Sequence, residues 1–291
     1  MPEVPAFLGA LERKPDSRDF PLGATSIPTP RPSTLGVDLR WLARNYQAQL
    51  PVCGPHAGSH NKAIQDHAAG YAILPRYTPR YTSIKMKDPA SPVYDGYAPD
   101  AGTDMRSLLA AFKTVGANSF GPLENDTTLS LTDYLSPTAV TPAMDSDAGS
   151  RLISAYAFGN ADYDSIANAV FQWKSAILLI KCDNGFWGTA TPTFTSPTYG
   201  HFVTAYDYDD MKGGIWVVDS ADPNDPLALK WIAKQFITPT FFFELGTTVD
   251  IPASLQQVLA HPTLAPEQKI TIAQQILNDI ASALTLIQKE I

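Results

Sequence analysis

The amino-acid sequence predicts an α+β fold, with helices early in the chain and an antiparallel β-sheet late in it. Three segments before residue 175 have the apolar spacing of helices, and four runs rich in β-branched and aromatic residues follow them. Helices that precede strands, instead of alternating with them, are typical of this class. The 291 residues are 44% hydrophobic, which is enough to build a packed core.

Residues 1–36 are interpreted as a Pro-rich N-terminal arm. The segment is crowded with prolines and turn residues, as in "PTPRPS", which favours an extended segment laid over a surface. We expect this arm to cross the back of the domain that follows, and occupation of a cleft is the alternative. The folded domain is predicted to span residues 37–246 and to open with "VDLRW".

The first predicted helix begins at Cys53 in "CGPHAGSHNKAIQDHAAGYAI", where apolar residues recur at helical spacing as far as Tyr71. Pro55 falls in its first turn, where a missing backbone N–H costs nothing. A second helix is predicted over 104–115, and a third over about 163–174.

Four strands are predicted over residues 175–182, 201–209, 214–220 and 238–245. Their sequences are "SAILLIKC", "HFVTAYDYD", "GIWVVDS" and "TPTFFFEL". Gly, Pro, Asn and Asp separate these runs, which indicates turns between neighbouring strands of an antiparallel sheet.

Residues 247–291 are predicted to form a C-terminal helical tail. From Ile270 to Ile291 the apolar residues step alternately by three and four positions, which is the seam of a short coiled coil. Two interpretations stay open: the helix docks on its own domain, or residues 266–291 pair with a second copy of the chain or with an assembly partner.

Charge and hydropathy exclude several classes of protein. The net charge of −8 and the lack of a basic run argue against nucleic acid or an anionic membrane as a partner. No apolar run approaches about 18 residues and no secretory signal pattern opens the chain, so we expect no membrane span and a cytoplasmic or virion-associated protein. The two cysteines, Cys53 and Cys182, are expected to be reduced thiols.

Three side chains fit a nucleophilic site. A cysteine becomes a nucleophile when a helix N-terminus and a neighbouring imidazolium stabilise its thiolate. Cys53 opens the first helix, and His201 opens a strand in "YGHFVTAYDYDD". The next strand ends in "WVVDS", which offers Asp219 to hold the second nitrogen of the His201 ring. This order of Cys, His and carboxylate is one known arrangement of such sites.

The sequence resembles papain-like cysteine peptidases, in particular their short bacterial and phage relatives. "YQAQLPVCGPHA" is similar to the family's Q-G-x-x-G-S-C-x-x-x-A, and "GHFVTAYDYDD" to its G-H-A-V-x-x-V-G-Y-D-D. "PDAGTDMRSLLAAFKTVGA" resembles its glycine-bearing substrate segment, and "RKPDSRDF", "VDLR" and "YDSIANAVFQWKSAILLIKC" resemble its flanking elements. The resemblance covers roughly residues 13–245, with the motifs in the family's order.

The resemblance implies a papain-like fold, in which a helical half and an antiparallel-sheet half enclose the active site in a cleft. It implies that Cys53 is the nucleophile, that His201 is the base and acid, and that Asp219 orients His201. It further implies that Gln47 is an oxyanion-hole donor and that Gly102 pairs with an extended peptide substrate. The implied function is a cysteine peptidase that uses no metal and no cofactor.

Several positions depart from the family pattern. Pro51 and Val52 replace the Gly-Ser before the nucleophile, Gly54 replaces the aromatic that often follows it, and Asp219 stands where the family has Asn. The Trp of the family's Asn-Ser-Trp-Gly is absent from "DSAD".

A competing alignment gives Gln49 the oxyanion role and puts His56 at the nucleophile position, with Cys53 as a structural cysteine. It needs an insertion, and we prefer the ungapped match through Gln47 and Cys53.

A second functional hypothesis is a catalytically silent papain-like module, used as a structural or binding part of a larger assembly such as a phage particle. The reactivity of the Cys53 thiol distinguishes the two. Other residues receive structural interpretations: Cys182 as core, His56 and His60 as helix residues and not zinc ligands, and "YDYDD" (206–210) as a solvated hairpin. "NGFWG" (184–188) is either a cleft wall or a packed hairpin tip.

Overall fold

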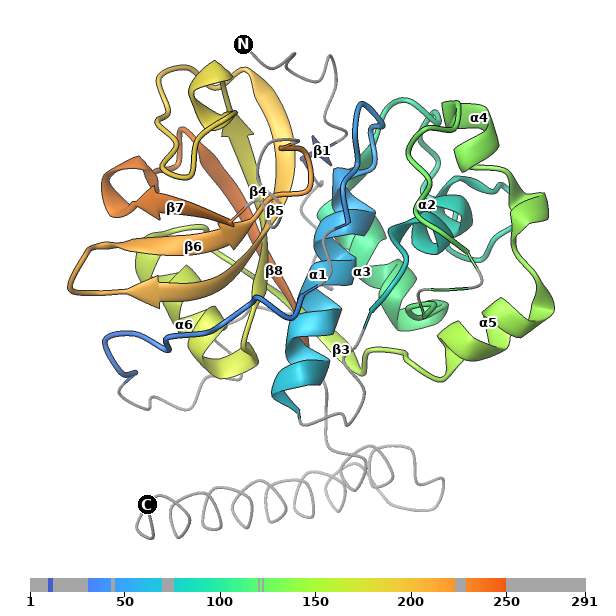
Figure 1. Cartoon of the computed structure of the whole chain (residues 1–291), viewed down its shortest axis with the longest axis horizontal. Coiled ribbons are helices and arrows are strands. Elements are labelled where there is room, and N and C mark those ends of the chain that lie inside the picture. The colour runs from blue at the N-terminus through green and yellow to red at the C-terminus, as the bar shows by residue number, and fades with distance from the viewer. Residues whose placement is uncertain are drawn as a thin grey trace, which may run out of the picture. The chain divides into compact units, whose positions relative to one another are not determined.

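Figure 1 shows a computed structural model of the chain, which describes residues 10–12, 31–42, 45–69, 76–119, 121, 123–222 and 229–249. Apart from Val249, these residues belong to one of the two compact units of the chain, Met1–Thr248. The other unit, Val249–Ile291, contains the predicted association helix over 266–291, which therefore lies outside the described residues.

The fold has a helical half and a sheet half, as the sequence predicts. The helices of the described residues are α1 (Cys53–Ala68), α2 (Pro79–Lys87), α3 (Met105–Thr114), α4 (Leu131–Tyr134), α5 (Pro142–Gly149) and α6 (Tyr163–Trp173). Their strands are β1 (Ala10–Leu11), β2 (Thr103–Asp104), β3 (Ala155–Gly159), β4 (Ala176–Cys182), β5 (Tyr199–Asp209), β6 (Gly214–Val218), β7 (Leu229–Ala233) and β8 (Phe242–Val249). The α+β class is confirmed.

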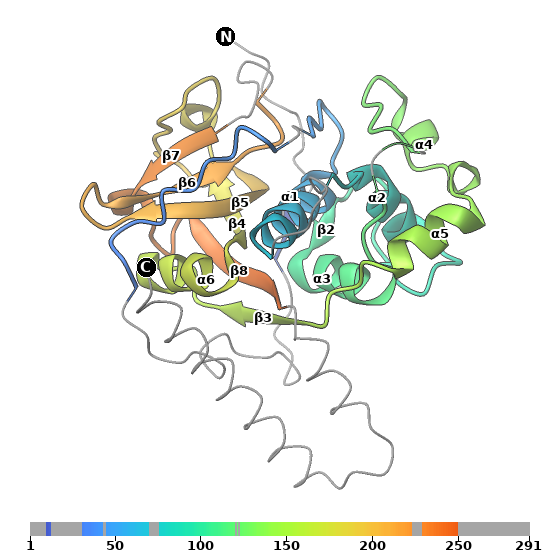
Figure 2. The same cartoon turned by 60° about the horizontal axis from the view of Figure 1, so that its bottom comes forward.

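The sheet half is a six-stranded sheet in the order β3-β8-β4-β5-β6-β7. The pairings of β4 with β8 and β5, of β5 with β6, and of β6 with β7 are antiparallel. Its central strand β4 reads "AILLIKC" and is buried at all but one position, because the elements around it cover both faces. Helix α6 packs on β4, β5 and β6 (Figure 2).

Helix α1 lies between the two halves, against β4 and β5 on one side and α2 and α3 on the other (Figures 1 and 2). Two glycines permit this close packing. A Cβ added at Gly58 would lie 2.3 Å from the ring of Phe112, and one added at Gly54 would lie 2.7 Å from Thr103 Cγ2. The glycine in place of the family's aromatic residue after Cys53 is therefore required by the approach of β2.

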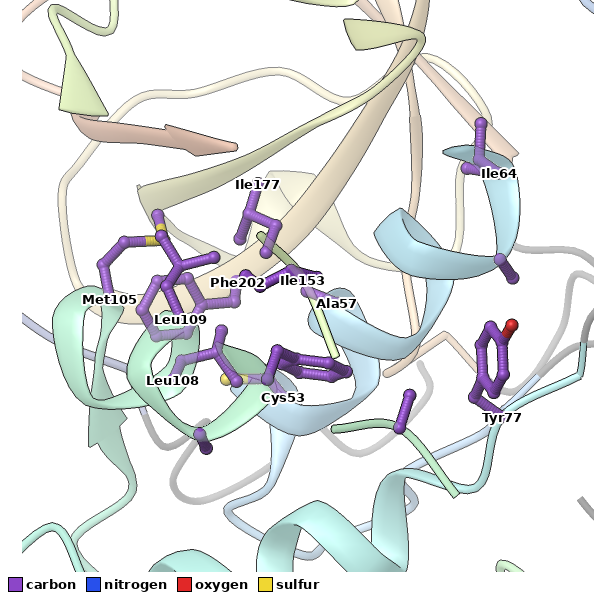
Figure 3. Packing of buried hydrophobic residues seen from close by; sticks show 14 of the residues in the cluster. Cys53, Ala57, Ile64, Tyr77, Met105, Leu108, Leu109, Ile153, Ile177 and Phe202 are labelled. Atoms are coloured by element: carbon purple, nitrogen blue, oxygen red, sulfur yellow. The ribbon is translucent and has the colours of Figure 1, made fainter. Parts of the chain in front are cut away.

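The main hydrophobic core lies at this junction (Figure 3). It joins Cys53 and Ala57 of α1 to side chains of α3, β4 and β5, among them Leu108, Ile177 and Phe202. The start of α1 is thus buried in the hydrophobic core.

Several elements were not predicted from the sequence. Helices α2, α4 and α5 and the strands β3 and β7 carry no strong periodicity, because they are short. The last strand begins at Phe242 and not at 238, since the N–H groups of Phe241 and Phe242 both donate to the Thr238 carbonyl and form a turn there. The first helix ends at Ala68, short of the predicted Tyr71.

The described part of the N-terminal arm near residue 31 is bound at the end of β5 distant from His201. Thr34 forms a bridge to Asp209, and Arg31 donates to Asp164, Asn168 and Asp210. This segment is fixed by polar contacts with the sheet half.

Candidate active site

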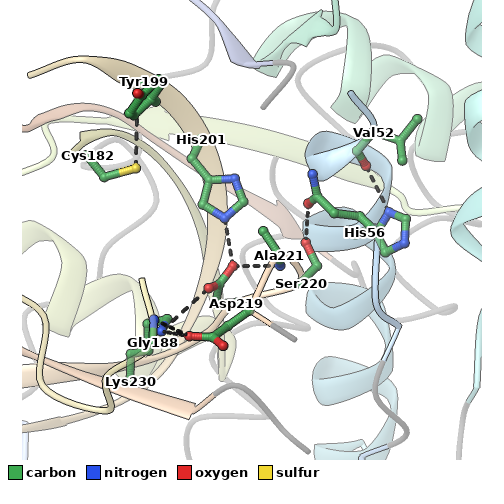
Figure 4. A network of polar contacts seen from close by, with 12 residues as sticks. Val52, His56, Cys182, Gly188, Tyr199, His201, Asp219, Ser220, Ala221 and Lys230 are labelled. Carbon is green, nitrogen blue, oxygen red and sulfur yellow. Dashed lines mark hydrogen bonds and ion pairs between the residues drawn. The ribbon is translucent and has the colours of Figure 1, made fainter. Parts of the chain in front are cut away.

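The candidate site is built around His201, the third residue of β5. His201 Nε2 lies 2.8 Å from Asp219 Oδ1, and both side chains are fully buried (Figure 4). Asp219 directly follows β6, whose antiparallel pairing with β5 brings the two side chains together. The backbone N–H of Ala221 donates to the same Asp219 oxygen at 2.9 Å, which fixes the carboxylate.

The second ring nitrogen of His201 remains available. His201 Nδ1 is buried and has no hydrogen-bond partner among the described residues. Because Nε2 bonds to Asp219, Nδ1 is the nitrogen that can exchange a proton with a thiol or a substrate.

Cys53 lies beside the residue that follows His201. The backbone N–H groups of Phe202 in β5 and of Gly54 at the start of α1 are near enough to its sulfur to favour the thiolate. The side chain is fully buried in the hydrophobic cluster (Figure 3). No hydrogen bond joins Cys53 to His201 within the described part of the chain.

Burial decides the protonation state of this thiol. It raises the pKa of Cys53 to about 12, and the nearby charge of Asp219 acts in the same direction. The backbone N–H groups of Phe202 and Gly54 lower the pKa but do not offset the burial. In this arrangement the thiol is protonated at neutral pH, although it stands at a helix N-terminus.

Gln47 is held against the Asp219 segment. Ser220 Oγ donates to Gln47 Oε1 at 2.7 Å, and the backbone N–H of Gln47 donates to the Ser220 carbonyl at 2.8 Å. Gln47 Nε2 donates to the carbonyl of Leu50 at 3.0 Å, across a turn in which Ala48 has a φ of 50°. A non-glycine residue in the left-handed region indicates a turn imposed by its surroundings. The amide of Gln47 is therefore fixed in position.

Two aromatic residues cover the His201 ring. Phe186 and Trp187, from the loop after β4, pack edge-on against it, with ring centroids 5.8 Å and 5.5 Å from the imidazole. The tryptophan missing from "DSAD" thus has a counterpart elsewhere in the chain. The "NGFWG" segment was singled out in the sequence, but its contact with His201 depends on the pairing of β4 with β5, in which Cys182 faces Tyr199.

Gly102 directly precedes β2 and has a φ of 74°, which suits glycine. Its carbonyl accepts a hydrogen bond from Lys87 Nζ. The extended pairing occurs at the next two residues, where β2 forms a parallel pair with β1 of the N-terminal arm.

The arm segment 10–12 lies next to the site, and not at the back of the domain as expected. Ala10 faces Thr103, and a Cβ added at Gly200, the residue before His201, would lie 2.5 Å from the Ala10 carbonyl oxygen. Glu12 forms an ion pair with Lys181 of β4. This part of the arm therefore contacts both halves, β2 on one side and β5 on the other.

His56 has a structural role in α1. Its Nδ1 lies 2.9 Å from the Val52 carbonyl, and its Nε2 accepts from Asn125 Nδ2 at 3.2 Å. Burial lowers the pKa of His56 to about 3, so the ring is neutral. The residue that begins α1 is Cys53, one turn earlier, which favours the ungapped alignment over the one that puts His56 at the nucleophile position.

The remaining candidates, Cys182 and His60, are buried side chains that make no hydrogen bond to His201 or Asp219 among the described residues. Cys182 Sγ lies 3.6 Å from the Tyr199 carbonyl, and burial raises the pKa of its thiol well above the usual value. His60 is buried within α1. Among the described residues no group of three or more His, Cys, Asp or Glu side chains fits a metal ion.

None of the helices described here is long and apolar enough to cross a membrane.

Comparison with known proteins gives a likeness of fold. No protein-family profile matches the sequence, and no curated protein matches it. Among solved structures, xylellain, a cysteine protease from Xylella fastidiosa, matches with a TM-score of 0.65 and 14% identity over 84% of this chain and 96% of that one.

Two further matches agree. The cysteine protease and lectin-like domains of Cwp84 from Clostridium difficile match with a TM-score of 0.58 and 14% identity, over 78% of this chain and 54% of that one. Digestive procathepsin L2 of Tenebrio molitor matches with a TM-score of 0.58 and 12% identity, over 84% of this chain and 78% of that one. At these identities the likeness establishes the fold alone: the chain has the papain-like cysteine peptidase fold.

Proposed function

We propose that this chain is a cysteine peptidase that uses Cys53 and His201. The observation that carries the proposal is the buried His201–Asp219 hydrogen bond of 2.8 Å, which leaves Nδ1 of the ring unpartnered among the described residues while Cys53 lies against Phe202. A ring that is fixed through one nitrogen and open at the other suits a base that serves a neighbouring nucleophile.

Acylation follows from these roles. His201 Nδ1 takes the proton of the Cys53 thiol, and the sulfur attacks the carbonyl carbon of a peptide bond. The developing oxyanion accepts hydrogen bonds from the Gln47 amide and the Cys53 backbone N–H. The C–N bond then breaks, and the leaving amine takes the proton from His201.

Deacylation uses the same groups in reverse. His201 removes a proton from a water molecule, which attacks the thioester carbonyl. The sulfur leaves and regains its proton, and a carboxylic acid is released. Asp219 accepts from Nε2 throughout and keeps the ring in one orientation.

The proposed substrate is an extended peptide laid along residues 102–104. The pairing of β1 with β2 supports this, since the backbone of Thr103 and Asp104 already pairs with one added strand. A substrate that uses the same groups must displace residues 10 and 11.

A second candidate function is the catalytically silent module. The full burial of Cys53 and the rise of its pKa to about 12 favour it, because an enzyme of this kind needs an accessible thiolate. The two functions differ in whether releasing the arm makes the thiol reactive.

Hydrolysis of a fluorescently labelled unfolded protein, such as casein, tests the proposal. Cys53→Ser is expected to lower the rate by at least about 100-fold, since it removes the nucleophile. Cys182→Ser is the matched control, a second buried cysteine that is expected to leave the rate unchanged. Equal rates for the wild-type chain and Cys53→Ser would refute the peptidase function.

A further inference from the structure

A buried lysine lies behind the His201–Asp219 pair. Lys230, on β7, is 1% exposed, and its Nζ donates to Asp222 Oδ2 at 2.7 Å and to the Thr189 carbonyl at 2.9 Å. The same Nζ lies 3.7 Å from Asp219 Oδ2 (Figure 4). It also lies 5.1 Å from the centroid of the Phe186 ring, which packs on His201.

The two oxygens of Asp219 have different surroundings. Oδ1 accepts from His201 and from the N–H of Ala221, whereas Oδ2 is buried and has no hydrogen-bond partner among the described residues. A buried carboxylate oxygen without a donor is costly unless a positive charge compensates it. Lys230 Nζ supplies that charge on the side of Oδ2.

A carboxylate at this position differs from the amide that the sequence resemblance would put there. An amide oxygen accepts a hydrogen bond from a histidine and carries no net charge. A carboxylate carries a full negative charge, so in a dry site it holds the proton of a neighbouring imidazolium more strongly than an amide does and opposes the transfer of that proton to a leaving group. A lysine beside the carboxylate reduces that attraction, so that the carboxylate and the lysine together act on the histidine more like a neutral amide.

We propose that Lys230 is a positioning residue for the reaction and acts through Asp219. Its charge compensates the Asp219 carboxylate on the side of Oδ2, leaves Oδ1 turned towards His201, and weakens the attraction between the carboxylate and the proton that the ring must give up. The inference rests on the proposed peptidase function. The alternative is that Lys230 serves only as the structural partner of Asp222.

A double-mutant cycle separates the two roles. All four proteins carry Asp222→Asn. Without that change, loss of Lys230 would leave the Asp222 carboxylate buried without its positive partner, and this would lower the stability for a reason unrelated to Asp219. The Asp222→Asn side chain keeps a carbonyl oxygen that can accept from the N–H of Gly188, which lies 2.9 Å from Asp222 Oδ2. The cycle compares the effect of Lys230→Met on the turnover rate in two proteins, one with Asp219 and one with Asp219→Asn. Thermal unfolding of all four proteins checks that each is folded.

The expected result is strong coupling between positions 219 and 230. With Asp219 present, Lys230→Met lowers the turnover rate of a fluorogenic peptide by roughly tenfold or more. With Asp219→Asn, the same change alters the rate by less than about threefold, because no carboxylate remains to compensate. An equal loss in both backgrounds would overturn the proposal and leave Lys230 a structural residue.

The ¹H resonance of the His201 Nε2–H group is the readout that does not need activity. This proton lies in the bond to Asp219 Oδ1, and we expect Lys230→Met to move it only when Asp219 is present. Cys53, Cys182 and His56 also lie within electrostatic reach of the pair, and the cycle leaves them unchanged. Coupling in the resonance without turnover in any protein, wild type included, would support the contact through Asp219 and refute the peptidase function. No coupling in the resonance would refute the role of Lys230.

Discussion

His201 Nε2 and Asp219 Oδ1 are 2.8 Å apart at a position with no access to solvent. Bulk water does not compete for either partner there, so the bond determines which nitrogen of the ring is left without a partner among the described residues. His201 lies on β5 and Asp219 directly follows the neighbouring antiparallel strand β6, and the loop with Phe186 and Trp187 covers the His201 ring.

Asp219→Ala is expected to lower the rate of peptide hydrolysis roughly 10- to 150-fold, since a hydrogen bond to a charged group contributes about 1.5–3 kcal/mol. Asp219→Asn keeps an acceptor and should retain more of the rate. Asp145→Asn, which changes a carboxylate on α5 that pairs with Lys85, is the control for a general effect of charge. Steady-state kinetics of the three variants would contradict this role of Asp219 if Asp219→Ala and Asp145→Asn behaved alike.

Gln47→Ala should lower the turnover rate by about 10²–10³-fold, because loss of one oxyanion-hole donor has this effect in acyl-transfer enzymes. Ser220→Ala removes only the hydroxyl that donates to Gln47 Oε1 at 2.7 Å, and a smaller loss is expected. The measurement is the initial rate at saturating peptide. A wild-type rate for Gln47→Ala would show that another group stabilises the oxyanion.

The parts of the site that could be predicted from the sequence are those fixed locally. Cys53 precedes a segment with clear helical spacing, and α1 begins at that residue. His201 lies on β5 and Asp219 directly follows β6, and a short hairpin joins these two strands, so their order in the sequence already predicts that they lie close together. The exact register also depends on an irregularity between Ala205 and Asp207, which the runs of apolar residues do not indicate.

The rest depends on contacts between distant segments. Trp187 reaches His201 only because β4 pairs with β5, and Lys230 lies on a strand that the sequence did not predict. The pairing of Ala10 with Thr103 joins two-residue strands, which are too short for any periodicity to indicate. Burial of Cys53 is likewise a property of the assembled core, and no local pattern predicts it.

Release of the arm is expected to expose the site. Substituting both Ala10 and Leu11 by Pro removes the two backbone N–H groups available for pairing with β2, at a loss of about 1.4 kcal/mol or more. This should raise the alkylation rate of Cys53 roughly tenfold. Thr34→Pro, which disturbs the arm at its bridge to Asp209, is the matched control and should not change that rate. Equal rates in all three proteins would exclude the arm as a cover.

The buried His56 makes the fold sensitive to acid. Its pKa is lowered to about 3 by burial, from a model-peptide value near 6.5, so the unfolded chain binds a proton that the folded chain does not. The stabilisation is complete above about pH 6.5 and is lost as the pH falls towards 3, by about 1.4 kcal/mol per pH unit for this one group.

His56→Gln keeps a donor for the Val52 carbonyl and lacks the titrating ring. Urea unfolding at several pH values between about 3 and 7 should therefore give a shallower pH dependence for this variant than for the wild-type chain. His67→Gln, at an exposed position near the end of α1, is the control. Parallel pH profiles for His56→Gln and the wild type would contradict the assignment of a neutral buried ring.

The rate at which Cys53 reacts with limiting iodoacetamide at about pH 5.5, followed by peptide mass mapping, tests the central claim most directly. An ordinary thiol with a pKa near 8.5 is almost wholly protonated at that pH and reacts very slowly. In the Ala10→Pro/Leu11→Pro variant, we expect Cys53 to react faster than Cys182 and faster than the same thiol in the denatured chain, and we expect His201→Ala to abolish the difference. If Cys53 reacts no faster than the denatured thiol, with or without His201, the nucleophile is absent and the chain is a silent module.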